Sequence, residues 1–329
     1  MTQKNLLLWA LVFICSGTAL WANDRYEDLY KPTDLAVHPN GEIFVLDSGN
    51  HRVVVLDDRL QERRVFGQKG KGPGEFLRPA ALAFLDENHL MIADSEANHV
   101  LVFDLQGNYL HVFLKESQSI GQLLVIPGKG VWTTEHDGQQ FSFRMGEDSQ
   151  KFPVRFFNLA GDFVRGVGVY KTHEIPFVSA QMNHGSLATD GQRVFFARFI
   201  ENELEVFDGE KTATHKYAPA FPPKKPDGKM VEEKQPDGSI SFQMKIEADV
   251  HCFDLLGLKD GSLLMLRAKS PETDGITPTE LVILKPSGEL LKTYPETYRA
   301  KRMALGNEGS FVYLIDEDDD GWFIRKTTL

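Results

Sequence analysis

An all-β fold built from one repeated four-stranded unit is predicted by three features of the sequence. The segment Pro32 to Val37 recurs as Pro79 to Phe84, 47 residues further along, and Asp47-Ser48 recurs as Asp94-Ser95 at the same displacement. Short apolar runs alternate with turn residues, and the apolar residues do not follow the helical period. Self-similarity at one fixed displacement indicates a repeated supersecondary unit.

Four short strands can be assigned in the first unit, because turn residues separate its apolar runs. In the order inner, second, third and outer strand, the runs are Leu35 to Val37, Ile43 to Leu46, Val53 to Leu56 and Arg63 to Phe66. Between the first two runs, Pro39-Asn40-Gly41 supplies a glycine for the positive φ that a tight turn needs.

Later units can be counted from the end of the third strand, where an apolar residue is followed by Asp or Asn. Such pairs are Leu56-Asp57, Phe103-Asp104, Phe157-Asn158 and Phe207-Asp208, spaced 47, 54 and 50 residues apart. A fifth unit is expected from Phe253 to Leu284 and a sixth from Met303 to Ile324. At roughly 50 residues per unit, the chain therefore contains six units.

The sixth unit reaches the end of the chain before its outer strand. Asp24 to Tyr30 can supply that strand, so that the two ends share a unit and close a ring without free strand edges. The sequence thus predicts an all-β, six-bladed β-propeller of four-stranded blades. Residues 221–249 fit no blade, because they hold Pro222-Pro223 and two Pro-Asp-Gly turns, and we expect a polar hairpin inserted between blades four and five.

Three stretches carry a resemblance to a known family. They are Pro32 to Val37, Ile43 to Val53, and Phe66-Gly67 followed by Gly72 to Pro79. These motifs resemble the NHL-repeat six-bladed β-propeller family, with the match strongest over residues 30–110. Together with the leader described next, the resemblance implies the exported bacterial type.

The first 22 residues have the layout of a secretory signal peptide. Lys4 precedes the apolar run Leu6 to Ile14, and small residues lead to Ala19 and Ala22. We expect cleavage there, a mature propeller over residues 23–329, and a periplasmic or extracellular location. The alternative, a retained anchor, is less favoured because a bilayer span needs roughly 20 apolar residues.

Charge and cysteine content narrow the partners. The formal net charge is −11, and Lys and Arg are scattered among a larger number of acids, which disfavours nucleic acid. Only Cys252 remains after the leader, so no intramolecular disulfide can form. We expect a monomer with no transmembrane segment in the mature chain.

One short segment resembles part of a calcium loop. Asp316, Asp318, Asp320 and Gly321 match its front half, where carboxylates at alternate positions surround the ion. Thr327 stands where the bidentate Glu belongs, and a solvated turn is the alternative. No cofactor is predicted, and calcium is the one ion that this pattern allows.

Aligning the ends of the second strands suggests a ligand site. The aligned positions are Asp47, Asp94, Glu135, Arg198, Arg267 and Asp316, which would stand around one face. Arg198 and Arg267 fall on neighbouring blades and could together hold an anion, with Trp132 beside them. In the alternative, each arginine pairs with an acid such as Glu201 or Glu272, and the tryptophan seals a blade core.

The favoured function is therefore non-catalytic: an exported binding module or scaffold that recognises a protein, peptide or small anionic ligand on one face. The alternative is a metal-assisted lyase or lactonase with Asp34 and Asp254 in the central channel. Peptidyl-hydroxyglycine lyases, which are similar in pattern, place zinc-binding histidines just after the proline that opens an inner strand. Thr33 and Ala80 occupy that position here, so a lyase of that type is disfavoured.

Overall fold

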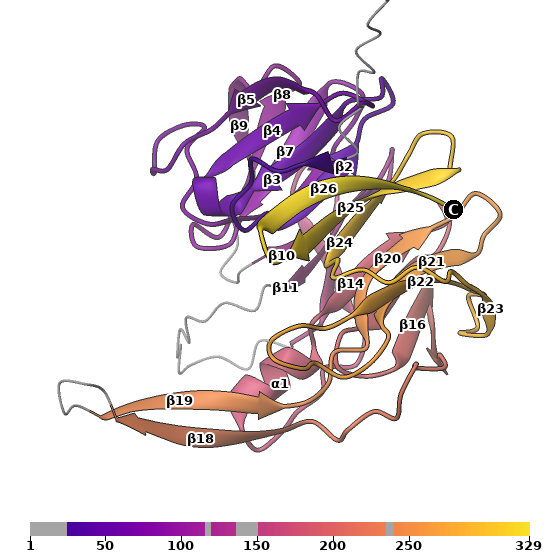
Figure 1. Ribbon diagram of the computed structural model, residues 1–329. Coiled ribbons are helices and arrows are strands. Elements are labelled where there is room, and N and C mark those ends of the chain that lie inside the picture. The colour runs from indigo at the N-terminus through magenta and orange to yellow at the C-terminus, as the bar shows by residue number, and fades with distance from the viewer. Residues whose placement is uncertain (1–24, 116–119, 136–150, 235–239) are drawn as a thin grey trace, which may run out of the picture.

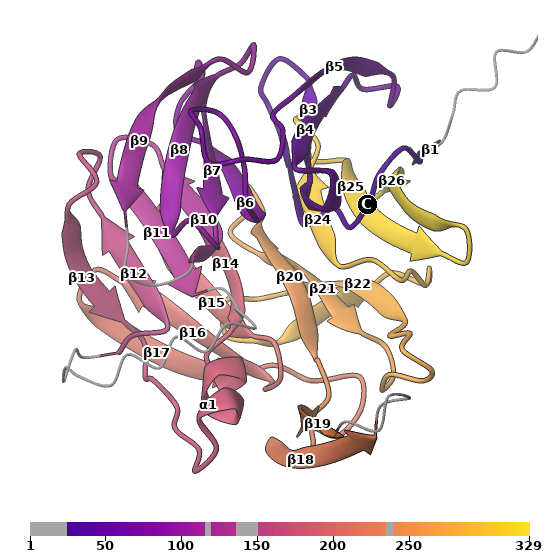
Figure 2. The same cartoon turned by 90° about the vertical axis from the view of Figure 1, so that its left-hand side faces the viewer.

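Six four-stranded antiparallel sheets surround a common axis in the computed structural model, which describes residues 25–115, 120–135, 151–234 and 240–329 (Figure 2). Each sheet is one blade, and consecutive strands within a blade are hydrogen-bonded neighbours. The predicted six-bladed propeller is confirmed.

Five blades are formed by consecutive strands. In chain order they are β2 (Asp34–Val37), β3 (Ile43–Asp47), β4 (Arg52–Leu56), β5 (Glu62–Phe66); β6 (Pro79–Phe84), β7 (His89–Asp94), β8 (His99–Asp104), β9 (Tyr109–Lys115); β10 (Ile120–Ile126), β11 (Gly130–Glu135), β12 (Val154–Phe157), β13 (Phe163–Val167); β14 (Gly185–Thr189), β15 (Val194–Arg198), β16 (Glu203–Asp208), β17 (Lys211–Lys216); and β20 (Cys252–Gly257), β21 (Leu263–Ala268), β22 (Thr279–Leu284), β23 (Leu290–Thr293).

The sixth blade joins the two ends of the described chain. Its first three strands are β24 (Arg302–Leu305), β25 (Phe311–Asp318) and β26 (Gly321–Thr328), and its outer strand is β1 (Arg25–Tyr26). Arg25 pairs with Arg325 across β1 and β26, and Tyr26 pairs with Ile324. The expected ring closure is confirmed, with an outer strand shorter than the expected segment.

Two elements lie outside the blades. One is the helix α1 (Pro176–Met182), and the other is a hairpin of β18 (Asp227–Lys234) and β19 (Ile240–Glu247). The helix α1 is too short to show a helical period in the sequence, and it has a proline in its first turn. No helix in the described residues is long and apolar enough to cross a bilayer.

Both elements extend from the same face of the propeller (Figure 1). The helix α1 lies in the connection from β13 to β14, and the hairpin lies in the connection from β17 to β20. Every connection from an outer strand to the next inner strand leaves the blades at one end, as do the turns between second and third strands. We call this side, with its elements 169–183 and 218–251, the insert face.

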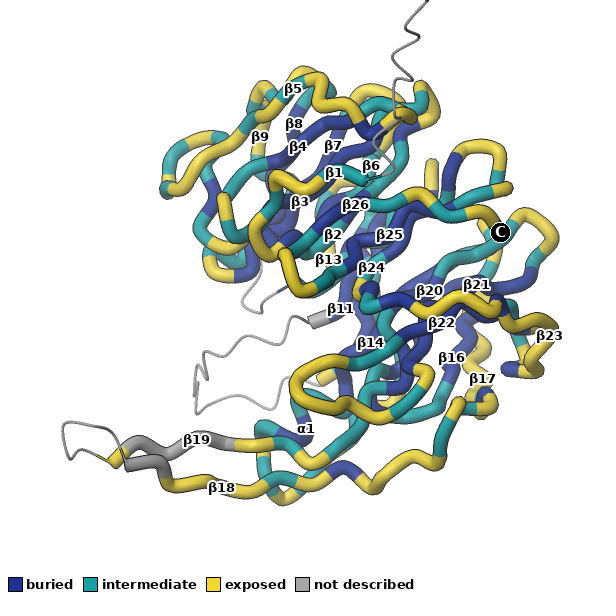
Figure 3. The backbone as a smooth tube through the Cα atoms, in the orientation of Figure 1, coloured by how far each residue is buried: buried dark blue, intermediate teal, exposed yellow. Residues whose placement is uncertain are grey.

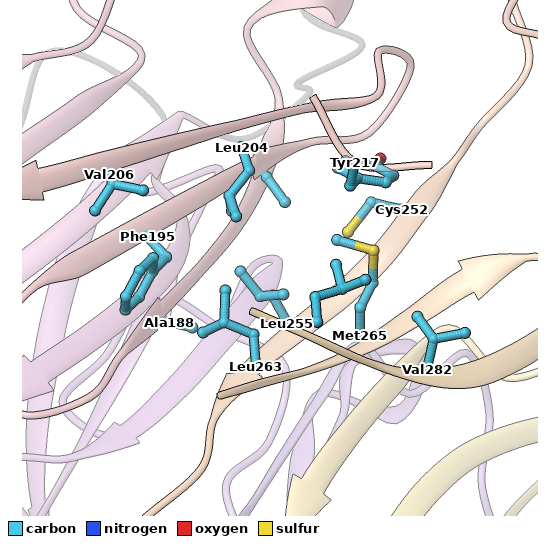
Figure 4. Close-up of a cluster of buried hydrophobic side chains, with 12 residues drawn as sticks. Ala188, Phe195, Leu204, Val206, Tyr217, Cys252, Leu255, Leu263, Met265 and Val282 are labelled. Atoms are coloured by element: carbon cyan, nitrogen blue, oxygen red, sulfur yellow. The ribbon is translucent and has the colours of Figure 1, made fainter. Parts of the chain in front are cut away.

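The core lies between neighbouring blades. The second and third strands are buried on both sides, as in β3, where all five residues are buried, while the outer strands are exposed (Figure 3). Between blades four and five, Phe195 and Leu204 pack against Met265 and Val282 (Figure 4). Apolar burial between blades is the main favourable term that fixes the ring.

Candidate functional site on the insert face

A charged residue stands at or near the insert-face end of the second strand in every blade, and it is buried in the five blades where its side chain is described. Five of the six aligned side chains are described, and they are Asp47, Asp94, Arg198, Arg267 and Asp316. The side chain of Glu135 lies outside the described residues. All five bind the backbone of the connection that enters their own blade, as the following contacts show.

Carboxylates hold the short connections. Asp47 Oδ1 accepts a hydrogen bond from the Tyr30 amide at 2.7 Å. In blade two, Asp94 Oδ2 accepts from the Leu77 amide at 2.6 Å. In blade six, Asp316 Oδ1 accepts from the Arg299 amide at 2.8 Å. Each acid therefore satisfies backbone donors that would otherwise be buried without a partner.

Arg198 holds the connection that contains α1. It is completely buried and forms a salt bridge with Glu205 on the neighbouring strand. Its Nη1 donates to the Met182 carbonyl oxygen at 2.8 Å, and its Nη2 donates to the Val169 carbonyl oxygen at 2.7 Å. One guanidinium thus fixes both ends of the segment around α1.

Arg267 holds the start of the connection that contains the hairpin. Its Nη1 donates to the Ala218 carbonyl oxygen at 2.6 Å, and its Nε donates to Glu280 Oε1 at 2.9 Å. The suggested partners Glu201 and Glu272 were wrong: Glu201 pairs with Lys171 instead. Both acids lie on the third strands: Glu280 is directly opposite Arg267, and Glu205, which is opposite Phe196, reaches Arg198 diagonally.

The structure does not bring Arg198 and Arg267 together over an open site. Each guanidinium is paired with an acid of its own blade and with carbonyl oxygens. The shared anion site therefore stays a prediction that these contacts do not support.

Trp132 lies in the core between blades three and four. It is 5% exposed. Its ring centroid is 4.6 Å from that of Phe156 and 6.4 Å from that of Phe207. A ligand would reach this ring only if the blade core opened.

The acidic residues of the expected calcium loop form a β-hairpin turn. Asp318 Oδ1 accepts from the Asp320 and Gly321 amides, and Asp318 Oδ2 accepts from Arg25 Nη1 at 2.7 Å. Thr327 lies within β26, paired with Val312. No three His, Cys, Asp or Glu side chains are grouped around a potential metal position in the described ranges. A calcium ion at Asp316, Asp318 and Asp320 therefore remains a prediction.

A second set of six residues, all polar except Ala81, lies around the axis at the start of the inner strands. Each is paired with the residue that precedes the second-strand charge, and the set, which we call the axial ring, comprises Asp34, Ala81, Gln122, Ser186, Asp254 and Arg302. Gln122, Ser186 and Arg302 were missed by the sequence analysis. Aligning the inner strands on a polar residue followed by an apolar one would have found them.

Four members of the axial ring join neighbouring blades. Asp34 Oδ2 accepts from the Leu82 amide at 2.9 Å, and Asp254 Oδ2 accepts from the Met303 amide at 2.9 Å. Gln122 and Ser186 accept in the same way from the Leu187 and Leu255 amides of the next blade. The side chain of Ala81 has no hydrogen-bond acceptor, and that of Arg302 has only donors, so neither can bind an amide of the next blade in this way.

Burial raises the pKa of both axial carboxyl groups. The pKa of Asp34 rises to about 7, against the opposing effect of Arg302 and backbone donors. Burial also raises the pKa of Asp254, and Arg302 again opposes the shift. Carboxyl groups with raised pKa values beside an arginine are typical of functional sites, although structural networks produce them too.

A pocket of about 410 Å³ opens between blades five and six on the insert face. Phe253, Ile276 and Ala300 are among its apolar residues, and Glu272 and Asp274 are among its five acids. Among the described residues, neither Glu272 nor Asp274 has a partner in an ion pair or a side-chain hydrogen bond, unlike Asp319, which pairs with Arg299. The pocket therefore combines apolar surface with uncompensated negative charge.

The contribution of Asp34 to stability should decrease between about pH 4 and pH 7, because the folded-state pKa of Asp34 is higher than its unfolded value of 3.8. The native state binds the extra proton at low pH and loses that stabilisation as the pH rises through about 7. We expect Asp34→Asn to reduce the loss by on the order of 2 kcal/mol, after allowing for partial exposure. Urea unfolding of both proteins across this pH range measures the free energy of unfolding. The same pH dependence of that free energy in the two proteins would contradict the prediction.

Comparisons with known proteins agree with this architecture. Residues 29–56 match the sequence model of the NHL repeat. No curated protein matches the sequence. A member of the DUF4221 family from Bacteroides vulgatus has a TM-score of 0.60 at 10% identity, over 93% of this chain and 96% of that chain.

Two further solved structures share the fold. A gluconolactonase from Xanthomonas campestris has a TM-score of 0.56 at 13% identity, over 92% of this chain and 88% of that chain. The WD40 repeats of RRP9 have a TM-score of 0.54 at 13% identity, over 92% and 95%. Identities this low establish the fold alone. The protein is a six-bladed β-propeller, and a segment that includes three strands of its first blade matches the NHL repeat.

Proposed function

We propose that this propeller is an exported binding module that recognises a protein or peptide on its insert face. The observation that carries the proposal is the anchoring of both insertions to that face by buried arginines. Arg198 fixes the segment around α1, and Arg267 fixes the start of the segment with the hairpin. Insertions held by a rigid scaffold are a common way to build a binding surface.

The hairpin and the pocket support a macromolecular ligand. The hairpin extends beyond the blades, where Val231 and Ile240 are exposed (Figure 1). Its base is supported by α1, because a Cβ atom at Gly228 would lie 2.7 Å from Val178 Cγ2. The acidic pocket between blades five and six favours a basic segment of the ligand over a small anion.

The proposal includes export and a monomeric state. Support for export comes from the leader-like residues 1–22, which lie outside the described residues. A periplasmic or extracellular binding module needs no cofactor and no nucleic acid partner, in keeping with the acidic composition.

Removing the hairpin should weaken peptide binding by about tenfold or more, because about 1.4 kcal/mol of lost contact produces that change. Asp227 and Glu247 are paired, so a short Gly-Ser turn can replace the residues between them. Peptides selected from a displayed random library on the intact protein provide the ligands, and fluorescence anisotropy gives their affinities.

The matched control is Asp208→Asn/Glu210→Gln, which removes two exposed acids from the opposite face. This variant should bind the selected peptides as the intact protein does. Equal binding by the hairpin-free protein, or weaker binding by the control alone, would count against the insert face.

The second candidate is catalysis at the axis, as in a lyase or lactonase. The raised pKa values of Asp34 and Asp254 favour it. These residues fit a divalent cation poorly, however, because Asp34 accepts from two amides and Arg302 Nη1 already lies 3.5 Å from Asp254 Oδ1. We therefore rank this candidate below peptide binding.

Elemental analysis by mass spectrometry distinguishes the two candidates. Because the axial carboxylates already have donors of their own, we expect no stoichiometric metal in the purified, signal-cleaved protein. About one calcium or zinc ion per chain, lost in Asp34→Asn/Asp254→Asn, would reverse the ranking.

A further inference from the structure

Arg198, Arg267 and Arg302 lie at strand ends on the insert face, and they differ in how far each guanidinium is buried and paired. Arg198 and Arg267 are buried, and each makes short bonds to carbonyl oxygens and to an acid of its own blade. Arg302 of the axial ring is different, because its side chain is 17% exposed and its contacts are longer. This contrast identifies Arg302 as the arginine that is available to a ligand.

The contacts of Arg302 leave one nitrogen free. Its Nε donates to the Thr33 carbonyl oxygen at 3.3 Å, and its Nη1 donates to the Phe253 carbonyl oxygen at 3.3 Å. Within the described part of the chain, Nη2 has no hydrogen-bond partner, and it is not among the buried atoms that lack one. Water or a ligand can therefore reach the Nη2 edge of the guanidinium.

The surroundings of Arg302 determine which ligand suits it. The ring of Phe199 lies 6.0 Å from the guanidinium carbon. Asp254 is the nearest paired acid, and all its bonds to Ser186, Leu255 and Met303 stabilise its ionised form. Asp34 is the other acid nearby, and in its protonated state it leaves part of the charge of Arg302 uncompensated.

We propose that Arg302 binds a carboxylate of the ligand at the insert-face end of the axis. The assignment rests on the proposed function, and it names the group that the ligand presents. One oxygen of a carboxylate can accept a charge-assisted hydrogen bond from the free Nη2, since Nη1 is already bound to the Phe253 carbonyl oxygen. A phosphate dianion suits the site less well, because Asp254 beside Arg302 would repel its second charge. The carboxylate can come from a peptide C-terminus or from a small free acid.

The two sources and the site are tested with three probes. These are N-acetylated alanyl-alanyl-phenylalanine with a free carboxylate, the same tripeptide as its carboxamide, and acetate. Affinities are measured by NMR chemical-shift titration at about pH 6, below the pKa of Asp34. We expect the free acid to bind about tenfold more tightly than the amide, since a charge-assisted pair contributes about that factor. Measurable acetate binding would identify a small acid as sufficient, and its absence would identify the peptide terminus.

Variants assign the preference to Arg302. In Arg302→Gln the preference for the acid should fall to about threefold or less. Arg78→Gln is the matched control, because Arg78 lies on the same face, is paired with Glu96 and is not part of the pocket between blades five and six. If Arg302→Gln does not fold, Arg302→Lys can replace it, and this variant should retain a preference for the acid because it keeps the charge. The comparison of acid with amide on the wild-type protein needs no variant at all.

The assignment is overturned if acid and amide bind the wild type equally, if neither binds, or if Arg302→Gln keeps the full preference. Equal binding of acid and amide, combined with weaker binding by the hairpin-free protein, would remove the role of Arg302 and leave peptide binding on the insert face intact. If the intact and the hairpin-free proteins bind the peptides with equal affinity, the proposed function itself is contradicted.

Discussion

The buried charge at the end of each second strand is the constraint on which the insert face depends. In a propeller, the connection that enters a blade must cross the end of that blade and satisfy its own backbone groups there. In the five blades whose side chain is described at this position, that charge makes the bond. Removing such a group leaves backbone groups and a paired charge without partners. This lowers the free energy of unfolding by about 3 to 5 kcal/mol.

The sign of that charge follows the length of the connection. Acids occur where the incoming connection is short and presents amide donors, as at Asp47 and Asp94. Arginines occur where the connection carries an insertion and presents carbonyl oxygens, as at Arg198 and Arg267. The axial ring forms a second layer of bonds between neighbouring blades, and Arg302 interrupts its pattern in the blade that closes the ring. The anchored insertions and the free Nη2 of Arg302 therefore lie at the same end of the molecule.

Much of the fold could be predicted from the sequence, because the strand rhythm and the turn residues repeat. The four strands of blade one and the closure through residues near Tyr26 were placed correctly. The aligned charges were found as well, but their role was not, because partners such as Glu205 and Tyr30 depend on how strands and connections meet in space. Arg302 was missed because its importance lies in what it leaves unpaired, which only the three-dimensional contacts reveal.

The most direct test of whether the buried arginine holds the insertion is the hydrogen exchange of residues 169–183 in an Arg198→Met/Glu205→Met protein. This pair of changes removes the bonds to the connection without leaving a buried charge unpaired. The account predicts about tenfold faster exchange in this segment, including α1, while β14, β15 and β16 keep their protection. Unchanged exchange in residues 169–183, or equal loss of protection throughout blade four, would show that the buried arginine does not hold the insertion.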